Sequence, residues 1–324
     1  MVRVRVLGAG PAGGAAALMA LQEGAHVDLF EKSPFPRHKV CGEFLSPESV
    51  RVLDRTGVRG TFEAQAARMP RMLLYFGERE KRGSLPDPAY GLSRSALDQL
   101  LLNAAISRGA KHHREKGDAS GTTVVATGRY ASAAKGKRLF GFKAHFRGPV
   151  SDAVEMFFIS GRAYVGVSPI ENGLTNVCGL AEEDVLGACN FEIDEYLARH
   201  RPLRERLDPL ARQWDWLTVG PLIFQHQLEE PAMPAIYRAG DALSFIDPFT
   251  GSGILSALFT GSEAGRAAAR GVDSSKHLKL CRSRLLQPFR ATSFFRQALV
   301  DGWGQWIAPW LPSSALFFLT RPKV

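Results

Sequence analysis

The sequence predicts a mixed α/β (α+β) fold of two interleaved parts with a helical C-terminal segment, and three observations support this prediction. A glycine-rich turn near residue 10 lies between a valine-rich strand and an alanine-rich helix. The middle of the chain holds several short strand candidates separated by Gly, Pro and Asn turns. A second glycine-rich turn near residue 251 leads into another helix of small residues. With 324 residues, 45% of them hydrophobic, the chain is long enough for two cores.

The first turn has the spacing of a dinucleotide-binding motif. It follows a strand predicted at residues 2–6 and precedes a helix that runs to about residue 23. The G-x-G-x-x-G turn consists of Gly8, Gly10, Pro11, Ala12 and Gly13. Gly8 permits the sharp turn, Gly10 lets a pyrophosphate approach the backbone, and Gly13 lets the helix pack against the strand. The helix N-terminus offers free N–H groups and the positive end of its dipole to the phosphates.

An acidic residue ends the next predicted strand, residues 26–30. Glu31 lies eighteen residues after the last glycine of the turn, where a carboxylate can accept hydrogen bonds from a ribose. Lys32 beside it is a further candidate for the cofactor site. A glycine turn without a ligand would have to match the strand, the helix and the acid by chance, so we predict dinucleotide binding. Arg3 and Arg5 alternate with valines, so we expect one face of the first strand to lie near solvent.

The second glycine-rich segment indicates which dinucleotide is bound. In "IYRAGDALSFIDPFTGSGI" a short strand candidate at residues 235–239 is followed by an acid and a helix start. A nicotinamide cofactor would not need this second set of residues, whereas the longer FAD needs a carboxylate for its ribityl hydroxyls. A helix N-terminus aimed at the flavin N1 and C2 carbonyl would stabilise the reduced anion. The candidate FAD-binding residues here are Gly240, Asp241, Pro248, Gly251, Gly253 and Ile254.

These two segments, together with "CGE" and "GLSRSALDQLL", resemble the FAD-dependent oxidoreductases that share the p-hydroxybenzoate hydroxylase fold. The stretch "RHKVCGEFLSP" is most similar to the geranylgeranyl reductase branch, and the similarity runs from residue 1 to about residue 270. The resemblance implies a Rossmann-like FAD-binding domain in which Arg94 lies along the FAD pyrophosphate or ribityl region. The alternative for Arg94 is a solvated helix-capping cation. Ala126 and Gly128 in "VVATG" are further candidate cofactor residues.

The loop "PFPRHKVCGEFLSP" is expected to return toward the flavin in this fold. Arg37 and Lys39 would then lie near the anionic cofactor, and Cys41 and Gly42 near its ring, where glycine lets the backbone pass closely. A cationic setting can favour a thiolate, and Cys41 could act as a proton donor or shape the substrate pocket. The resemblance implies a role for Cys41 in reduction. The alternative is that Cys41 is a small buried apolar residue.

The resemblance and the strand pattern together predict how the chain is divided. The FAD-binding domain is expected at residues 1–60, 91–136 and 232–272. The antiparallel-sheet substrate domain is expected at residues 61–90 and 137–231, and the helical C-terminal segment at residues 273–324. The sequence "IENG" between two strand candidates predicts a hairpin, and residues 190–212 predict a helix on the outer side of the sheet.

The chain departs from the family pattern in three places. "AYVGVSP" stands where prenyl reductases often carry an aromatic-rich motif and halogenases W-x-W-x-I-P, so halogenation loses support and prenyl reduction becomes less certain. Few residues separate Gly109 from "VVATG", so a strand or hairpin is expected to be trimmed. There is no second Rossmann unit, which implies that the reductant is either transiently bound NAD(P)H or an electron-donor protein.

The sequence therefore predicts an FAD-dependent oxidoreductase that acts on a hydrophobic substrate, of isoprenoid, lipid or polyketide-like kind. The favoured reaction is alkene reduction by hydride from flavin N5, with Cys41 or a water supplying the proton. The alternative is a class A flavin monooxygenase that hydroxylates an aromatic or polyketide substrate. A flavin electron carrier without its own substrate is the third possibility.

Composition limits the partners and the location. The four cysteines have no metal-binding spacing, so we expect free thiols and no metal. The start lacks a secretory signal, so we expect a cytoplasmic protein. The net charge of +9 is concentrated in residues 261–324, but no nucleic-acid-binding signature is present. Trp303, Trp306 and Trp310 could lie at the inner membrane surface or pack as a lid on the protein body.

Overall fold

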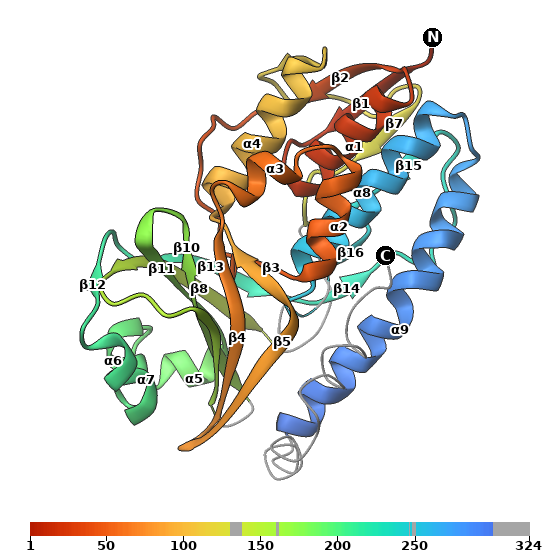
Figure 1. Cartoon of the computed structure of the whole chain (residues 1–324). Coiled ribbons are helices and arrows are strands. Elements are labelled where there is room, and N and C mark those ends of the chain that lie inside the picture. The colour runs from red at the N-terminus through yellow and green to blue at the C-terminus, as the bar shows by residue number, and fades with distance from the viewer. Residues whose placement is uncertain (130–137, 160–161, 246, 248–250, 301–324) are drawn as a thin grey trace.

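The computed structural model describes residues 1–129, 138–159, 162–245, 247 and 251–300. A parallel sheet occupies one end of the molecule (Figure 1). Its five strands are β1 (Arg3–Leu7), β2 (His26–Phe30), β6 (Lys111–His113), β7 (Thr123–Val125) and β15 (Ile236–Arg238). They are arranged in the order β15-β7-β1-β2-β6. The helices at this end are α1 (Pro11–Gln22), α2 (Pro47–Arg55), α3 (Arg59–Glu63), α4 (Arg94–Ser107) and α8 (Gly253–Ala269).

A nine-stranded sheet occupies the other end. Its strands are β3 (Phe44–Leu45), β4 (Ala67–Phe76), β5 (Arg79–Gly91), β8 (Leu139–Arg147), β9 (Ala153–Ile159), β10 (Ala163–Ile170), β11 (Leu174–Glu182), β12 (Ala211–Arg212) and β13 (Leu217–Leu222). The order is β12-β8-β11-β10-β9-β4-β5-β3, with β13 also paired to β8. The sheet is not wholly antiparallel as predicted, because β4 and β9 run parallel. β4 comes from the early excursion at residues 61–90 and β9 from the later one. The domain ranges given above remain a proposal.

The remaining elements cover or connect the two sheets. They are η1 (Glu171–Gly173), α5 (Glu183–Gly187), α6 (Ile193–Ala198), α7 (Arg201–Leu207), β14 (Gln225–His226), η2 (Gly240–Ala242), β16 (Ser244–Phe245) and α9 (Ser274–Val300). Among the described residues, no helix combines the length and the apolar composition needed to cross a bilayer. The prediction about the three C-terminal tryptophans falls outside the described residues.

The first strand has the mixed character that its alternating sequence predicts. Val4 and Val6 of β1 are fully buried. Arg3 keeps 71% of its side chain exposed, and Arg5 packs its guanidinium over the Phe30 ring at 4.5 Å from the centroid. The prediction that one face of this strand lies near solvent is confirmed. β1 is the middle strand of the sheet, but its first residues lie at the end of the sheet, where Arg3 is exposed.

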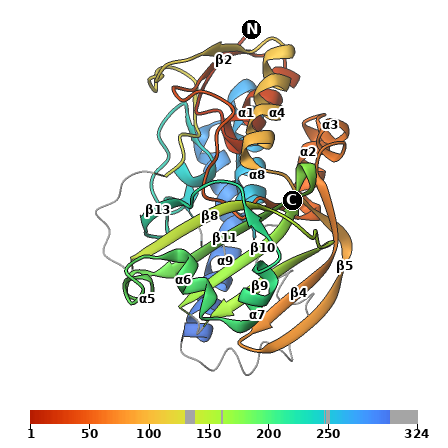
Figure 2. The same cartoon turned by 90° about the vertical axis from the view of Figure 1, so that its left-hand side faces the viewer.

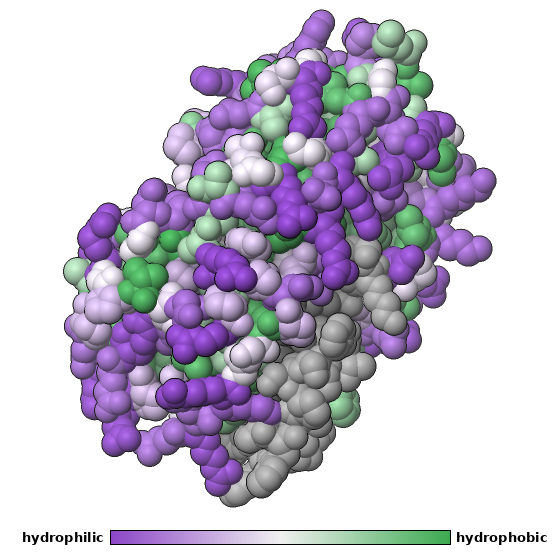
Figure 3. Space-filling model, in the orientation of Figure 1, coloured by the Kyte–Doolittle hydropathy of each residue, from purple (hydrophilic) through white to green (hydrophobic). Residues whose placement is uncertain are grey.

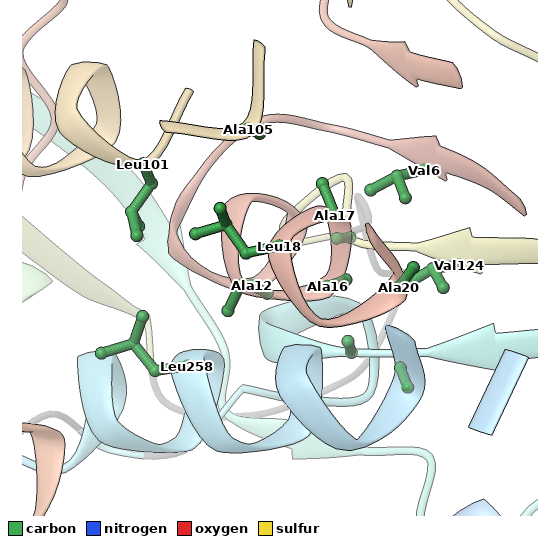
Figure 4. Packing of buried hydrophobic residues seen from close by; sticks show 14 of the residues in the cluster. Val6, Ala12, Ala16, Ala17, Leu18, Ala20, Leu101, Ala105, Val124 and Leu258 are labelled. Atoms are coloured by element: carbon green, nitrogen blue, oxygen red, sulfur yellow. The ribbon is translucent and has the colours of Figure 1, made fainter. Parts of the chain in front are cut away.

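Two helices pack so closely that they bring the two glycine-rich segments together. A Cβ at Gly261 of α8 would overlap the backbone of Ala12 in α1, and a Cβ at Gly265 would overlap that of Ala16. Figure 4 shows α8 passing directly beside α1, and Leu101 of α4 lies on another side of α1. Because these positions have no side chain on α8, the start of α8 is held close to the first turn.

The nine-stranded sheet has two faces, which we call the outer and the inner face. The outer face carries buried side chains such as Phe142, Val165 and Val177, and packs with Leu197 and Leu203 in one core. The helices α5, α6 and α7 lie on this side (Figure 1, Figure 2). The alternate residues of the same strands form the inner face, which contacts the 31–45 loop at Cys41 and Gly42 and, through Tyr164, reaches Asp247.

Two further predictions are settled by these elements. The "IENG" hairpin is confirmed, because η1 joins antiparallel β10 and β11, with Asn172 at φ +59°. The helix predicted over 190–212 is instead two short helices, α6 and α7, and it lies on the outer side as expected. Between Gly109 and β7 the only regular element is the short strand β6.

Candidate cofactor and active site

The first turn is built so that only glycine fits at two of its positions. Gly8 has φ +97°, and a Cβ there would overlap the carbonyl of Ala126, which follows β7. A Cβ at Gly13 would overlap the carbonyl oxygen of Gly8. Gly10 is the N-cap of α1, and no side chain caps this helix start, where Pro11 stands at the first position. The free N–H groups are therefore left for an anion.

Glu31 is held in place by several donors. The Arg37 guanidinium donates two hydrogen bonds to its oxygens at 2.9 Å, and the amides of Ser33 and Ala9 donate at 2.9 and 3.2 Å. Burial raises the pKa of this carboxyl, but the hydrogen bonds outweigh it and lower the pKa to about 2. Lys32 beside it is exposed. The carboxylate thus stays ionised next to the first turn, where a ribose would lie.

Arg94 faces the same turn from α4. Its Nη2 would lie 3.3 Å from a Cβ built on Gly10. The guanidinium donates to both oxygens of buried Asp98, at 2.7 and 2.8 Å. Burial works against its charge, yet Asp98 raises the pKa of Arg94 overall. Only 17% of the Arg94 side chain is exposed, so the alternative of a solvated surface cation is wrong.

The second segment closes over the first. Gly240 has φ +59°, and a Cβ there would lie 2.9 Å from the Ala12 Cβ. The Asp241 side chain is accessible to solvent, but protein surrounds it on most sides. This partial burial raises the pKa of its carboxyl, and the charges of Arg94 and Arg129 oppose the rise. The prediction that two distant turns meet is confirmed by this contact. Arg129 was not predicted, because nothing in the sequence links it to Asp241.

The start of α8 lies beside these residues. Gly251 has φ +67°, and a Cβ there would lie 2.8 Å from Phe44 Cδ1. Gly253 and Ile254 begin the helix, which has no side-chain cap. Pro248 lies outside the described residues. Added Cβ atoms at Gly253, and likewise at Gly42 and Gly128, would meet only open space.

These residues fit FAD. The uncapped start of α1 and Arg94 suit a pyrophosphate, and the uncapped start of α8 suits the flavin N1 and C2 carbonyl. The ionised Glu31 suits ribose hydroxyls, and Asp241 suits the ribityl chain. The open space beside Gly42, Gly128 and Gly253 leaves room for a bulky group. We propose these residues as the FAD site.

Cys41 does not have the environment that the sequence predicts. We expected nearby cations to favour its thiolate, and this expectation is wrong. Burial raises the pKa of Cys41, although Arg94 acts in the opposite direction. Arg37 and Arg94 are already paired with Glu31 and Asp98, so neither guanidinium is committed to the thiol. Cys41 is part-buried and packs against the core, and its thiol keeps its proton at neutral pH.

A buried charged cluster that the sequence did not predict lies next to Cys41. Glu43, Lys143 and His145, which we call the inner cluster, are each no more than 3% exposed. The carboxylate of Glu43 accepts hydrogen bonds from the Lys143 ammonium and, at 2.8 Å, from His145 Nε2. A lysine and a histidine at alternate positions of the strand "LFGFKAHFR" could have signalled a polar patch on one face of the sheet.

Comparisons with known proteins agree with the cofactor prediction. Residues 1–135 match the family described as FAD binding domain. A digeranylgeranylglycerophospholipid reductase of Thermoplasma acidophilum is 25% identical, over 85% of this chain and 79% of its own length. A menaquinone reductase of Mycolicibacterium smegmatis is 33% identical over 33% of this chain, and this match spans only 27% of that reductase.

A solved structure shows the same fold. The flavin-dependent brominase Bmp2 superposes with a TM-score of 0.80 at 18% identity, covering 98% of this chain and 92% of its own. At such identity the likeness concerns the fold alone. The predicted resemblance to flavoproteins of the p-hydroxybenzoate hydroxylase fold, with geranylgeranyl reductases among the relatives, is confirmed. Residues 1–135 thus match an FAD-binding domain, and the chain as a whole is similar to FAD-dependent enzymes in sequence and to a flavin-dependent one in fold.

Proposed function

We propose that the protein reduces a carbon–carbon double bond in a hydrophobic, isoprenoid-like lipid. The observation that supports this proposal most is the arrangement on the inner face. The Cys41–Gly42 backbone lies against β10 and β11, where Asn176 Nδ2 donates to the Cys41 carbonyl at 3.2 Å and Ser168 Oγ to the Gly42 carbonyl at 3.5 Å. A protonated thiol is thereby placed beside this face.

Apolar side chains continue from that point across the inner face. Gly166 on β10 lies beside Met156, whose Sδ would be 3.3 Å from an added Cβ, and part-buried Phe158 and Tyr164 follow. The face of the molecule in Figure 3 is mainly hydrophilic in its described part, with small separate hydrophobic patches. The part-buried apolar side chains Met156 and Phe158 on the inner face suit a hydrophobic ligand.

When bound and reduced, FAD supplies a hydride from N5, and the proton that completes the saturated bond comes from an acid of the protein or from water. Cys41 can be this acid because its loop lies against the inner face and its thiol carries a proton, although the raised pKa makes it a weaker donor than an ordinary thiol. The open space beside Gly42 leaves room for an alkene near the thiol, and the apolar side chains exclude water.

Two other reactions remain as candidates. A class A monooxygenase would hydroxylate a ring instead, and the brominase shows that proteins of this fold include a halogenating enzyme. An electron carrier would have no substrate of its own. The reductant is proposed to be NAD(P)H or an electron-donor protein.

The test starts with the absorption spectrum of the purified protein mixed with FAD. Flavin bands that stay with the protein through gel filtration would support the cofactor site. The photoreduced protein is then given a polyprenyl lipid without oxygen and, separately, with oxygen. Gain of two hydrogens without oxygen supports reduction, and gain of an oxygen atom supports the monooxygenase. Flavin that stays reduced with every lipid supports the electron carrier.

The variant Cys41→Ser tests the role of the thiol. We expect it to keep the bound FAD but to lose about a hundredfold or more in turnover, as removal of a general acid does. Unchanged turnover would mean that water supplies the proton.

We further propose contact with an anionic membrane surface through α9. This helix carries six Lys or Arg and no Asp or Glu, and Lys276, Lys279 and Arg290 are exposed on it. Phe294 is 60% exposed near its end. Sedimentation with vesicles of phosphatidylglycerol and phosphatidylcholine, against phosphatidylcholine alone, tests this contact. Loss of about 1 kcal/mol of binding per charge is expected for Lys276→Gln or Lys279→Gln.

A further inference from the structure

The inner cluster lies where three separate segments meet. Glu43 belongs to the loop that carries Cys41, and its amide N–H donates to Cys41 Sγ at 3.4 Å. The Glu43 carboxylate also accepts the backbone N–H of Arg94 at 2.6 Å, at the start of α4. Lys143 and His145 supply the contact with β8 of the nine-stranded sheet. The Glu43 carboxylate therefore joins the loop that carries Cys41, the start of α4 and strand β8 of the nine-stranded sheet.

A further contact attaches the loop to the same cluster. The Lys143 ammonium donates a second hydrogen bond, to the carbonyl of Lys39, at 3.2 Å. Glu43 itself has φ +54°, a left-handed conformation that costs of order 1 kcal/mol for a residue with a side chain. The loop is thus held in a strained conformation by charged hydrogen bonds at both sides of Cys41.

Stability alone does not explain such a cluster. Removing two charges and an imidazole from water costs several kcal/mol, and apolar residues of similar volume are often as stable. The outer face offers a comparison: both carboxylate oxygens of buried Glu155 on β9 share the single Arg206 Nε–H, with 2.9 Å from Nε to each oxygen. Glu155 has no contact with the cofactor segments among the described residues, whereas Glu43 contacts two of them.

We propose that Glu43 is a positioning residue, which with Lys143 and His145 fixes Cys41 and Arg94 at the flavin site. The proposal rests on the proposed FAD site, since positioning matters only if the flavin binds there. It predicts that loss of the Glu43 charge loosens the thiol loop and weakens FAD binding. Loss of the Glu155 charge on the other face changes neither.

The experiment compares Glu43→Gln with its matched control Glu155→Gln. The labelling rate of Cys41 by a thiol reagent is measured in FAD-free protein, with Cys41→Ala defining the background of the other cysteines. We expect Glu43→Gln to raise this rate about tenfold and to weaken FAD binding about tenfold. The loss of one hydrogen bond to a charged group changes an equilibrium by about this factor. Glu155→Gln is expected to change both by less than about twofold, while Glu43→Gln melts at lower temperature.

Wild-type labelling and wild-type FAD affinity in folded Glu43→Gln would overturn the proposal. Equal effects in the two variants would overturn it as well, since they would show general loosening. If Glu43→Gln does not fold, His145→Leu removes one donor and keeps the Glu43–Lys143 pair. A rise in labelling of about threefold is then expected, and no rise overturns the proposal. Failure of wild-type protein to bind FAD would refute the proposed function but leave the labelling result interpretable.

Discussion

The outer and inner faces of the nine-stranded sheet are formed by alternate residues of the same strands, yet they serve different ends. Phe142, Val165 and Val177 on the outer face are at most 1% exposed and form one closed core. On the inner face Lys143 is fully buried and paired with Glu43, and Phe158 is only part-buried. Alternation along a strand thus separates the residues that stabilise the sheet from those that shape the site.

The largest effect is expected from truncating the outer core. Phe142→Ala removes a side chain that is 1% exposed, so the free energy of unfolding should fall by about 3–5 kcal/mol. Urea unfolding measures this loss. FAD affinity of the folded variant should be unchanged, because Phe142 faces away from the cofactor segments. The inner-face control Phe158→Ala should lower the free energy of unfolding clearly less than Phe142→Ala does, since Phe158 is only half-buried. Equal costs would contradict the division into a core face and a site face.

Two carboxylates paired with arginine sharpen the comparison through pH. Burial raises the pKa of both, but at Glu31 the hydrogen bonds win and lower the pKa to about 2. At Glu155 burial prevails over Arg206, and the pKa is raised. Ionised Glu31 therefore stabilises the fold above its unfolded pKa, and that stability is lost as pH falls from about 5 through 2. Glu155 has the opposite effect, because its contribution to the stability of the fold increases as the pH falls through its raised pKa.

Urea unfolding of Glu31→Gln and Glu155→Gln at pH 7 and at low pH tests this difference. The free energy of unfolding of Glu31→Gln should be lower than that of the wild type by on the order of 3 kcal/mol at neutral pH. This difference should shrink toward pH 2. The gap for Glu155→Gln should not shrink in that way. A constant gap for Glu31→Gln would show that its carboxylate is not held ionised by Arg37.

The cofactor end of the fold is predictable from sequence because its constraints are local. Gly8 and Gly13 meet within one turn, so their spacing alone encodes the contact. The inner cluster was not predictable, since Lys143 finds its partner Glu43 a hundred residues away. The thiol of Cys41 was misjudged for a similar reason. A count of nearby cations does not show that each is already paired with an acid of its own.

The smallest effect concerns two neighbours on β10 that point to opposite faces. Gly166→Leu puts a side chain on the inner face, where its Cβ would lie 3.3 Å from the flexible Met156 Sδ, so the fold should tolerate it. If the lipid binds along the inner face, KM should rise about tenfold, equal to about 1.4 kcal/mol, while FAD affinity stays unchanged. Val165→Leu enlarges a fully buried outer-face residue and should instead cost about 1–3 kcal/mol of stability without changing KM. Steady-state kinetics and urea unfolding of both variants separate the faces, because a change of KM in Val165→Leu, or none in Gly166→Leu, would place the substrate elsewhere.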